Sequence, residues 1–193
     1  MLNSGFTHRV REESGRVAGP LLLFVGFTAL AGLLAAGQLE EYQVKAAFLY
    51  NFAKFVAWPP ESFKTATDPI VICILGANPF GNTLQQTVSG KTVDERAFVV
   101  RPLSDPQSAC KCHLLFVNAA ERRQFRSLLR SLRGAGVLTV GEDEAFTADG
   151  GVIDFKLQNG KIHLEVNLAA AEYENLRISS RLLSLAQIVR KDP

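Results

Sequence analysis

Two carboxylates on a predicted β-hairpin are the first residues whose types and spacing suggest chemistry. Alternating apolar and polar residues predict a hairpin over residues 153–166, and its register places Asp154 opposite Glu165. A glycosidase uses such a pair in a cleft, with one carboxyl of raised pKa. Here Lys156 and His163 form the neighbouring pair, and no cleft is implied by the sequence. We therefore expect these four side chains to form a charged, solvated face that binds a partner.

A second group, Cys110, Cys112 and His113, consists of residue types that bind metals. Their spacing is not that of a zinc site, and haem attachment requires two residues between the cysteines. Successive residues of a strand point to opposite faces, so Cys112 and His113 do not converge on one ion. No serine of this sequence lies in a nucleophile elbow. We therefore expect no metal, no cofactor and no enzymatic activity.

The hairpin is the best-specified element that positions these residues. The dipeptide Asn159-Gly160 tolerates the positive φ angles of a two-residue turn. This turn places three apolar pairs on one face: Leu157 with Ile162, Phe155 with Leu164, and Ile153 with Val166. A slip of one residue would move the apolar set of one strand to the other face, so the register is well defined.

The segment after the hairpin predicts a helix and an exposed apolar patch. Four apolar residues recur at helical spacing: Leu182, Leu185, Ala186 and Val189. Two serines before them, Ser179 and Ser180, are candidates for the helix N-cap. We expect Ile178 and Leu183 to lie outside the core, near the hairpin. An exposed apolar patch of this kind marks a partner interface or a homodimer interface.

Upstream segments alternate between apolar strands and amphipathic helices. Strands are expected at 70–75, 97–101, 112–117 and 137–140, and helices at 40–56, 82–88 and 121–133. The first of these helices carries an apolar stripe of Val44, Ala47, Phe48, Phe52 and Phe55, and the last sets four apolar residues against five arginines. The alternation predicts a single α/β domain: a mixed, mostly parallel β-sheet flanked by helices, with a C-terminal hairpin and helix.

The N-terminus has the order of a secretory signal peptide. An apolar run at 21–36 follows three arginines and is followed by small residues. The alternative is an uncleaved membrane anchor, although a span needs roughly 20 apolar residues. We expect residues 1–37 to be a signal peptide, or an N-terminal anchor, and residues 38–193 to fold outside the cytoplasm. The net charge of +2 argues against a nucleic-acid partner.

Export makes a disulfide the expected state of two of the three cysteines. Cys73 lies inside one buried strand and Cys112 opens another, and adjacent strands bring Cα atoms within the range of a disulfide. Cys110 precedes the strand, and a bond between Cys110 and Cys112 would close a small strained ring. We expect a bond between Cys73 and Cys112; the alternative is three reduced thiols.

Six blocks of the sequence resemble the YfiR family of secreted bacterial proteins. They are VKAAFLYNFAKFVAWP, IVICILGANPFG, CHLLFV, VLTVGEDEAF, GGVIDF and KIHLEVNLAAAEYENLRISSRLLSLAQIV, in family order over nearly all of residues 44–189. The third block carries its cysteine at Cys112, as the family does. Some members carry a second cysteine pair around the hairpin, where this chain has Thr147 and Asp154.

The resemblance implies a periplasmic regulator that is not an enzyme. The best-described type binds the periplasmic domain of an inner-membrane diguanylate cyclase and holds it inactive, and an outer-membrane lipoprotein can sequester it. The implied role links envelope stress or redox state to cyclic-di-GMP signalling. The alternative is a periplasmic accessory protein that binds a small hydrophobic ligand among Phe48, Tyr50, Phe52 and Trp58.

Overall fold

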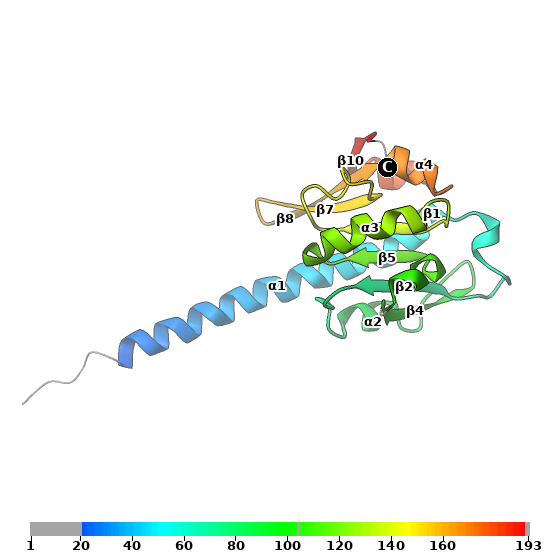
Figure 1. Ribbon diagram of the computed structural model, residues 1–193. Coiled ribbons are helices and arrows are strands. Elements are labelled where there is room, and N and C mark those ends of the chain that lie inside the picture. Colours follow the sequence, from blue (N-terminus) through cyan, green and yellow to red (C-terminus); the bar gives the residue numbers. More distant parts are fainter. Residues whose placement is uncertain (1–20, 104, 192–193) are drawn as a thin grey trace, which may run out of the picture. The chain divides into compact units, whose positions relative to one another are not determined.

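The computed structural model describes residues 21–103 and 105–191, with side chains from residue 37 onward. The chain divides into two compact units, Met1–Gln38 and Leu39–Pro193. In the first unit the described backbone is helical, as part of helix α1 (Leu21–Phe55). The second unit is an α/β domain (Figure 1). No helix among the described residues combines the length and the apolar character that a membrane crossing requires.

A mixed sheet forms the centre of the domain. Its strand order is β10-β8-β7-β6-β5-β2-β4-β3 in the described part of the chain. The bounds in chain order are β2 (Ile70–Leu75), β3 (Thr92–Val93), β4 (Arg96–Pro102), β5 (Leu114–Val117), β6 (Leu138–Gly141), β7 (Ile153–Gln158), β8 (Lys161–Asn167) and β10 (Ala186–Val189). The pairs β3–β4 and β7–β8 are antiparallel, and the others are parallel. This arrangement confirms the predicted fold class.

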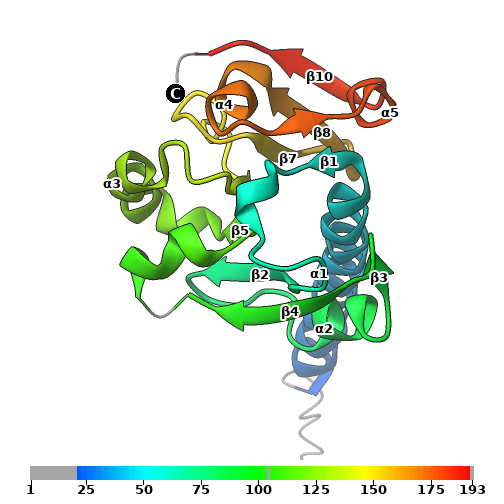
Figure 2. The same cartoon turned by 90° about the vertical axis from the view of Figure 1, so that its right-hand side faces the viewer.

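Helices cover both faces of the sheet, which is why its central strands are continuous apolar runs. The remaining helices are α2 (Thr83–Val88), α3 (Arg122–Leu132), α4 (Leu168–Tyr173) and α5 (Ser180–Leu183), with 3₁₀ turns η1 (Pro60–Ser62), η2 (Pro106–Lys111) and η3 (Ala119–Glu121). Figure 2 shows α1 and α3 on opposite sides of the sheet. The core accordingly has two parts, one with α1 and α2 and one with α3 and η2. A small separate pair, β1 (Val56–Ala57) and β9 (Arg177–Ile178), is antiparallel.

The buried face of α1 shares only Phe52 with the predicted stripe. The apolar residues of α1 that lie in the core are Ala46, Leu49, Phe52 and Ala53, and they are followed by the buried Val56 of β1. Val44 is 47% exposed, and Ala47 is exposed as well. The segment is apolar around most of its circumference, because Phe48 and Tyr50 also pack against the core from its sides. Periodicity therefore predicts the helix but does not single out one face.

The hairpin has the predicted register at every pair. Phe155 pairs with Leu164, and Asp154 pairs with Glu165. Asn159 and Gly160 have φ angles of 52° and 72°, as a tight turn with two left-handed residues requires. The alternation and the turn chemistry agree, so local sequence alone defines this element.

The predicted C-terminal helix is wrong after its first turn. Ser179 caps α5 through a hydrogen bond from the Leu182 N–H to its hydroxyl, as expected, but α5 has only four residues. The chain then forms β10, which pairs in parallel with β8. Helical spacing of Leu185 and Val189 is overridden here, because the open edge of β8 offers backbone hydrogen bonds to an extended segment.

Candidate functional site

The disulfide between Cys73 and Cys112 is present, as predicted. Cys73 lies in β2, and Cys112 is the residue that ends η2, two residues before β5. Their Cα atoms are 5.9 Å apart, and both side chains are buried. The bond fastens η2 to the sheet on the side that α3 covers. Cys110 is a free, exposed thiol.

His113 has a structural environment. Its Nδ1 accepts a hydrogen bond from the Val71 N–H at 3.0 Å, and its Nε2 lies 3.0 Å from the Ser62 carbonyl. A carbonyl only accepts, so Nε2 carries the proton and the ring is neutral. Burial lowers the pKa of His113, and its ring stacks on Phe63. No group of three metal-binding side chains occurs among the described residues.

The four hairpin residues predicted to bind a partner, Asp154, Lys156, His163 and Glu165, do not form a solvated face. Asp154 is fully buried and Glu165 is 9% exposed, so this part of the prediction is wrong. Lys156 is half-buried, and its Nζ lies 2.6 Å from Asp154 Oδ2. His163 alone is exposed. Alternation correctly placed the carboxylates side by side but could not show that another segment covers them.

That covering segment is the loop of residues 142–149, here called the acidic loop. Lys156 donates to the carbonyl of Glu144 at 2.6 Å, which fixes one end of the loop over the hairpin. Thr147 is fully buried and donates its hydroxyl to Glu165. Lys191 Nζ, from the segment after β10, reaches the Thr147 hydroxyl at 3.0 Å and Glu165 Oε1 at 3.3 Å.

The acidic loop is also fastened to both helices that flank the sheet. Glu142 lies 2.7 Å from the buried Lys45 of α1 and accepts a hydrogen bond from Tyr42 at 3.2 Å. Asp149 pairs with Arg122 of α3 at 2.6 Å. The cluster of acidic residues is visible in the sequence, but its partners come from distant segments, so no local pattern predicts these contacts.

The two buried carboxyls differ in their electrostatics. Burial raises the pKa of Asp154 to about 6, against the opposing effect of Lys156. Neither carboxylate oxygen of Asp154 receives a well-directed hydrogen bond from the described residues, although Lys156 Nζ lies 2.6 Å from Oδ2. Burial also acts to raise the pKa of Glu165, but hydrogen bonds from Thr147 and Lys191 outweigh it and lower the pKa.

The end of β10 is fastened to the same region by Asn167. The Asn167 side chain donates to the carbonyls of Thr147 and Lys191 at 3.1 and 2.9 Å and accepts from the Lys191 N–H at 3.1 Å. One buried amide thus joins β8, the acidic loop and the last described residues. The position of the edge strand β10 therefore depends on this polar cluster.

The exposed apolar residues at the C-terminal end of the domain are not the ones predicted. Ile178 and Leu183 are half-buried and pack against the core, with Ile178 paired to Val56. In the described residues after β9, the large exposed apolar side chains are Leu185, at 69%, and Ile188, at 49%. The sequence pattern places Leu185 on the apolar side of a helix and does not single out Ile188, whereas the chain is extended from residue 186 onward.

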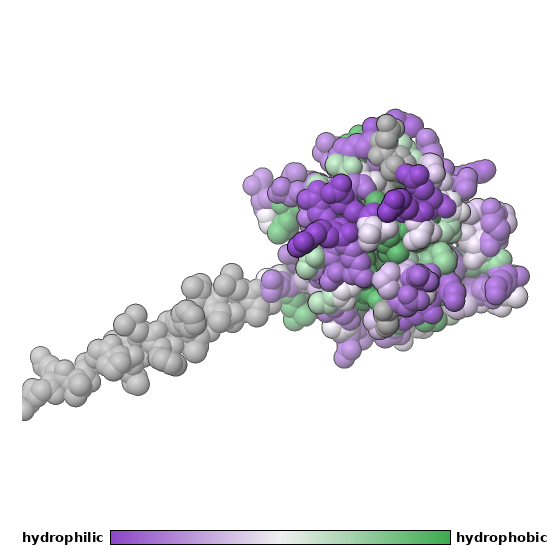
Figure 3. All heavy atoms as spheres, in the orientation of Figure 1, coloured by the Kyte–Doolittle hydropathy of each residue, from purple (hydrophilic) through white to green (hydrophobic). Residues whose placement is uncertain are grey.

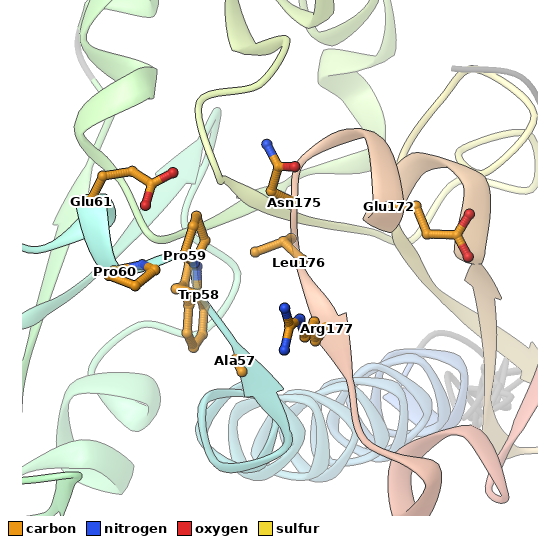
Figure 4. Close-up of a pocket in the computed structure, with 9 residues that line it drawn as sticks. All are labelled: Ala57, Trp58, Pro59, Pro60, Glu61, Glu172, Asn175, Leu176 and Arg177. Carbon is orange, nitrogen blue, oxygen red and sulfur yellow. The ribbon is translucent and has the colours of Figure 1, made fainter.

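A cavity of about 610 Å³ lies beside the β1–β9 pair (Figure 4). Its lining residues are Ala57, Trp58, Pro59, Pro60, Glu61, Glu172, Asn175, Leu176 and Arg177. Figure 4 shows the Trp58 indole on one side, with Leu176 and Arg177 on the other. Trp58 also donates from Nε1 to the His113 carbonyl at 3.1 Å.

The four aromatic residues predicted to surround a ligand do not share this cavity. Phe48 and Phe52 pack on each other and on Phe155. Tyr50 contacts Phe98, and only Trp58 lines the cavity. Three of the four therefore belong to the packing of α1 on the sheet.

A comparison with known protein families identifies the domain. Residues 42–187 match the model of the YfiR/HmsC-like family. The chain belongs to this family. This match confirms the expected family. YfiR/HmsC-like proteins are periplasmic regulators in cyclic-di-GMP signalling. Thr147 and Asp154, which stand in the region where some members carry a second cysteine pair, are both fully buried in this YfiR/HmsC-like domain.

Proposed function

We propose that this YfiR/HmsC-like protein represses an inner-membrane diguanylate cyclase by binding its periplasmic domain. Residues 1–37 then direct export and are cleaved, and the domain acts by binding without catalysing a reaction. The family match over residues 42–187 carries the proposal. The fold supports it with an open strand edge, because β10 is terminal in the sheet.

The proposed contact surface is the β10 edge, defined here as residues 185–188 together with His163. Leu185 and Ile188 are its exposed apolar side chains. Ala186 pairs with Leu164, so Leu185 and His163, which precede them, lie at the same end of the edge. An edge strand with exposed apolar residues presents both free backbone groups and apolar area to a partner.

The remaining predicted contact residues have a supporting role in this proposal. Ile178 and Leu183 pack β9 and α5 against the core. Glu165 accepts a hydrogen bond from Lys191, which follows β10 in the chain. Asp154 and Lys156 hold the acidic loop at the hairpin. An outer-membrane lipoprotein that sequesters the repressor would use the same edge, and its binding would then compete with binding to the cyclase.

A binding experiment tests the proposed surface. Leu185→Glu places a charge on the exposed edge, and we expect it to weaken capture of the cyclase periplasmic domain at least tenfold in a titrated pull-down. Val99→Glu is the matched control, because Val99 is 41% exposed on β4, away from β10. Equal binding by Leu185→Glu and the native protein would reject the surface. Conversion of a dimer to a monomer by Leu185→Glu, without loss of cyclase binding, would assign the edge to a homodimer.

The cavity beside β1–β9 supports a second candidate function, the binding of a small ligand. The flat indole of Trp58 and the guanidinium of Arg177 suit a ligand with an apolar ring and an anionic group. A thermal-shift screen of such compounds tests it, with Arg177→Ala as the matched variant. A shift of the melting temperature that Arg177→Ala does not reduce would place the ligand elsewhere, and no shift with any compound would reject this function.

A further inference from the structure

Helix α3 has an apolar side and an arginine side. Phe125, Leu128 and Leu132 are buried against the sheet. The helix contains four arginines and no acidic residue, and Arg133 follows its last turn. The apolar side is thus fully used in packing, and the arginine side faces outward.

Two of these arginines have acidic partners. Arg122 lies 2.6 Å from Asp149 and 3.5 Å from Asp143. Arg126 shares Asp149 at 3.6 Å, and its side chain remains 63% exposed. Arg123 and Arg130 are exposed and form no ion pair within the described part of the chain. The positive charge of this side therefore exceeds the charge of the carboxylates around it.

The three most exposed arginines of α3 lie in one row, and Arg126 is the one of them that has an acidic partner. Arg123, Arg126 and Arg130 are separated by three and four residues, a spacing that places them on one face of a helix over roughly 10 Å. Figure 3, in the orientation of Figure 1, shows strongly hydrophilic residues gathered over α3. We call this row the arginine face. The net charge of the whole chain is only +2, so the face is a local concentration of charge.

The composition of the arginine face favours phosphate groups over a folded protein partner. A guanidinium binds phosphate through two parallel hydrogen bonds, which explains why arginine is frequent where phosphates are recognised. The core of a protein interface needs apolar or aromatic side chains and is depleted of charge. None of the large exposed apolar residues of the described chain lies on α3. The surface offers charge without the apolar centre of a protein interface.

The exposed Tyr173, the last residue of α4, lies beside the arginine that follows α3 and supports the same interpretation. Tyr173 is 47% exposed, and the guanidinium of Arg133 lies 5.6 Å from the centre of its ring. Tyrosine is enriched where proteins meet the membrane–water boundary, because its ring is apolar and its hydroxyl is polar. Arginines beside an exposed tyrosine therefore match a lipid headgroup layer.

We propose that the arginine face of α3 binds the anionic phospholipid headgroups of a membrane surface. The contact is electrostatic, since the apolar side of α3 is already buried in the domain. Each basic residue near an anionic surface strengthens binding by roughly fivefold, so three arginines give reversible binding. This surface is separate from the β10 edge and would keep the domain beside the membrane while it binds a membrane-anchored partner.

Vesicle sedimentation of the purified exported protein tests the proposal. The vesicles contain phosphatidylcholine alone or with 30 mol% phosphatidylglycerol. We expect binding to the anionic vesicles to exceed binding to the neutral ones and to fall in 0.5 M NaCl, where screening is strong. The double variant Arg123→Glu/Arg130→Glu should lower the partition coefficient by roughly 30-fold or more, which corresponds to about 2 kcal/mol.

A control of equal charge change separates the face from net charge. Lys64→Glu/Lys161→Glu replaces two exposed lysines outside α3, and we expect it to bind nearly as the native protein does. An equal loss in both double variants would overturn the proposal, as would equal binding of the native protein to neutral and anionic vesicles. If Arg123→Glu/Arg130→Glu loses binding to the cyclase domain in solution but binds vesicles as the native protein does, the arginine face binds an acidic protein instead of a membrane.

Discussion

Away from its turn, the β7–β8 hairpin is buried on both faces, but by different means. One face places Phe155 against Phe48 and Phe52 of α1, in an aromatic cluster. The other places Asp154 and Glu165 beneath the acidic loop, among lysines and a threonine. The same alternation of residues thus produces an apolar interface on one side and a polar interface on the other.

This difference separates contacts that stabilise the domain at every pH from contacts whose contribution to stability changes with pH. Apolar burial depends little on pH, whereas a buried carboxylate is favourable only when its charge is matched. Glu165 has two donors, Thr147 and Lys191, and Asp154 has one lysine nearby. Changes on the first face should therefore affect stability at every pH, and changes on the second should depend on pH.

Phe155→Ala is the change with the largest expected effect. Removing a buried aromatic side chain between Phe48 and Phe52 leaves a cavity, so we expect a loss of about 3–5 kcal/mol in the free energy of unfolding. Urea denaturation at pH 7 measures it. Leu157→Ala, on the same face but 57% exposed, should lose less than about 1 kcal/mol. Equal losses for both variants would show that burial on this face does not stabilise the fold.

Thr147→Val tests the polar face at nearly constant volume. The variant removes the hydroxyl that donates to Glu165 and accepts from Lys191, and the buried carboxylate then loses a partner. We expect a loss of about 1–3 kcal/mol at pH 7. The pKa of Glu165 should rise, because the hydrogen bond that lowers it is gone. Unchanged stability at pH 7 would mean that the acidic loop is not held by this contact.

Asp154→Asn should change the pH dependence of stability. The folded state raises the pKa of Asp154 from 3.8 to about 6, so the folded state binds the extra proton between these values. The contribution of Asp154 to stability is therefore lost as pH rises from about 4 through about 6. Relative to the native protein, Asp154→Asn should gain about 1 kcal/mol between pH 5 and pH 7.5.

Denaturation of both proteins at the two pH values measures this gain. His113 and Glu174 also have shifted pKa values. Their contributions to the pH dependence of stability cancel in this comparison, because both proteins retain these residues. A difference between the two proteins that is independent of pH would contradict the raised pKa of Asp154.

The hairpin shows how far a sequence can predict this fold. Alternation and Asn159-Gly160 determine the register, because both act within about a dozen residues. The Cys73–Cys112 bond could likewise be predicted, since both cysteines adjoin strands that form neighbours in a parallel sheet. These predictions depend on local pattern and on the spacing of strands.

The missed features depend on contacts between distant segments. Leu185 and Val189 have a spacing that suits a helix, but the free edge of β8 makes an extended strand more favourable. Asp154 lies where alternation places it, but the acidic loop that covers it is held by Lys45, Tyr42 and Arg122 from two different helices. No periodicity encodes such partners, so the position of the candidate surface required the structure.

Repression of cyclase activity is the most direct test of the proposed function. Membranes that carry the inner-membrane diguanylate cyclase would be incubated with the purified protein, and cyclic-di-GMP synthesis would be measured. The native protein and Val99→Glu should lower the rate of synthesis, whereas Leu185→Glu should not, because its charge lies on the β10 edge. Synthesis that is unaffected by the native protein at saturating concentration would contradict the assignment of a repressor.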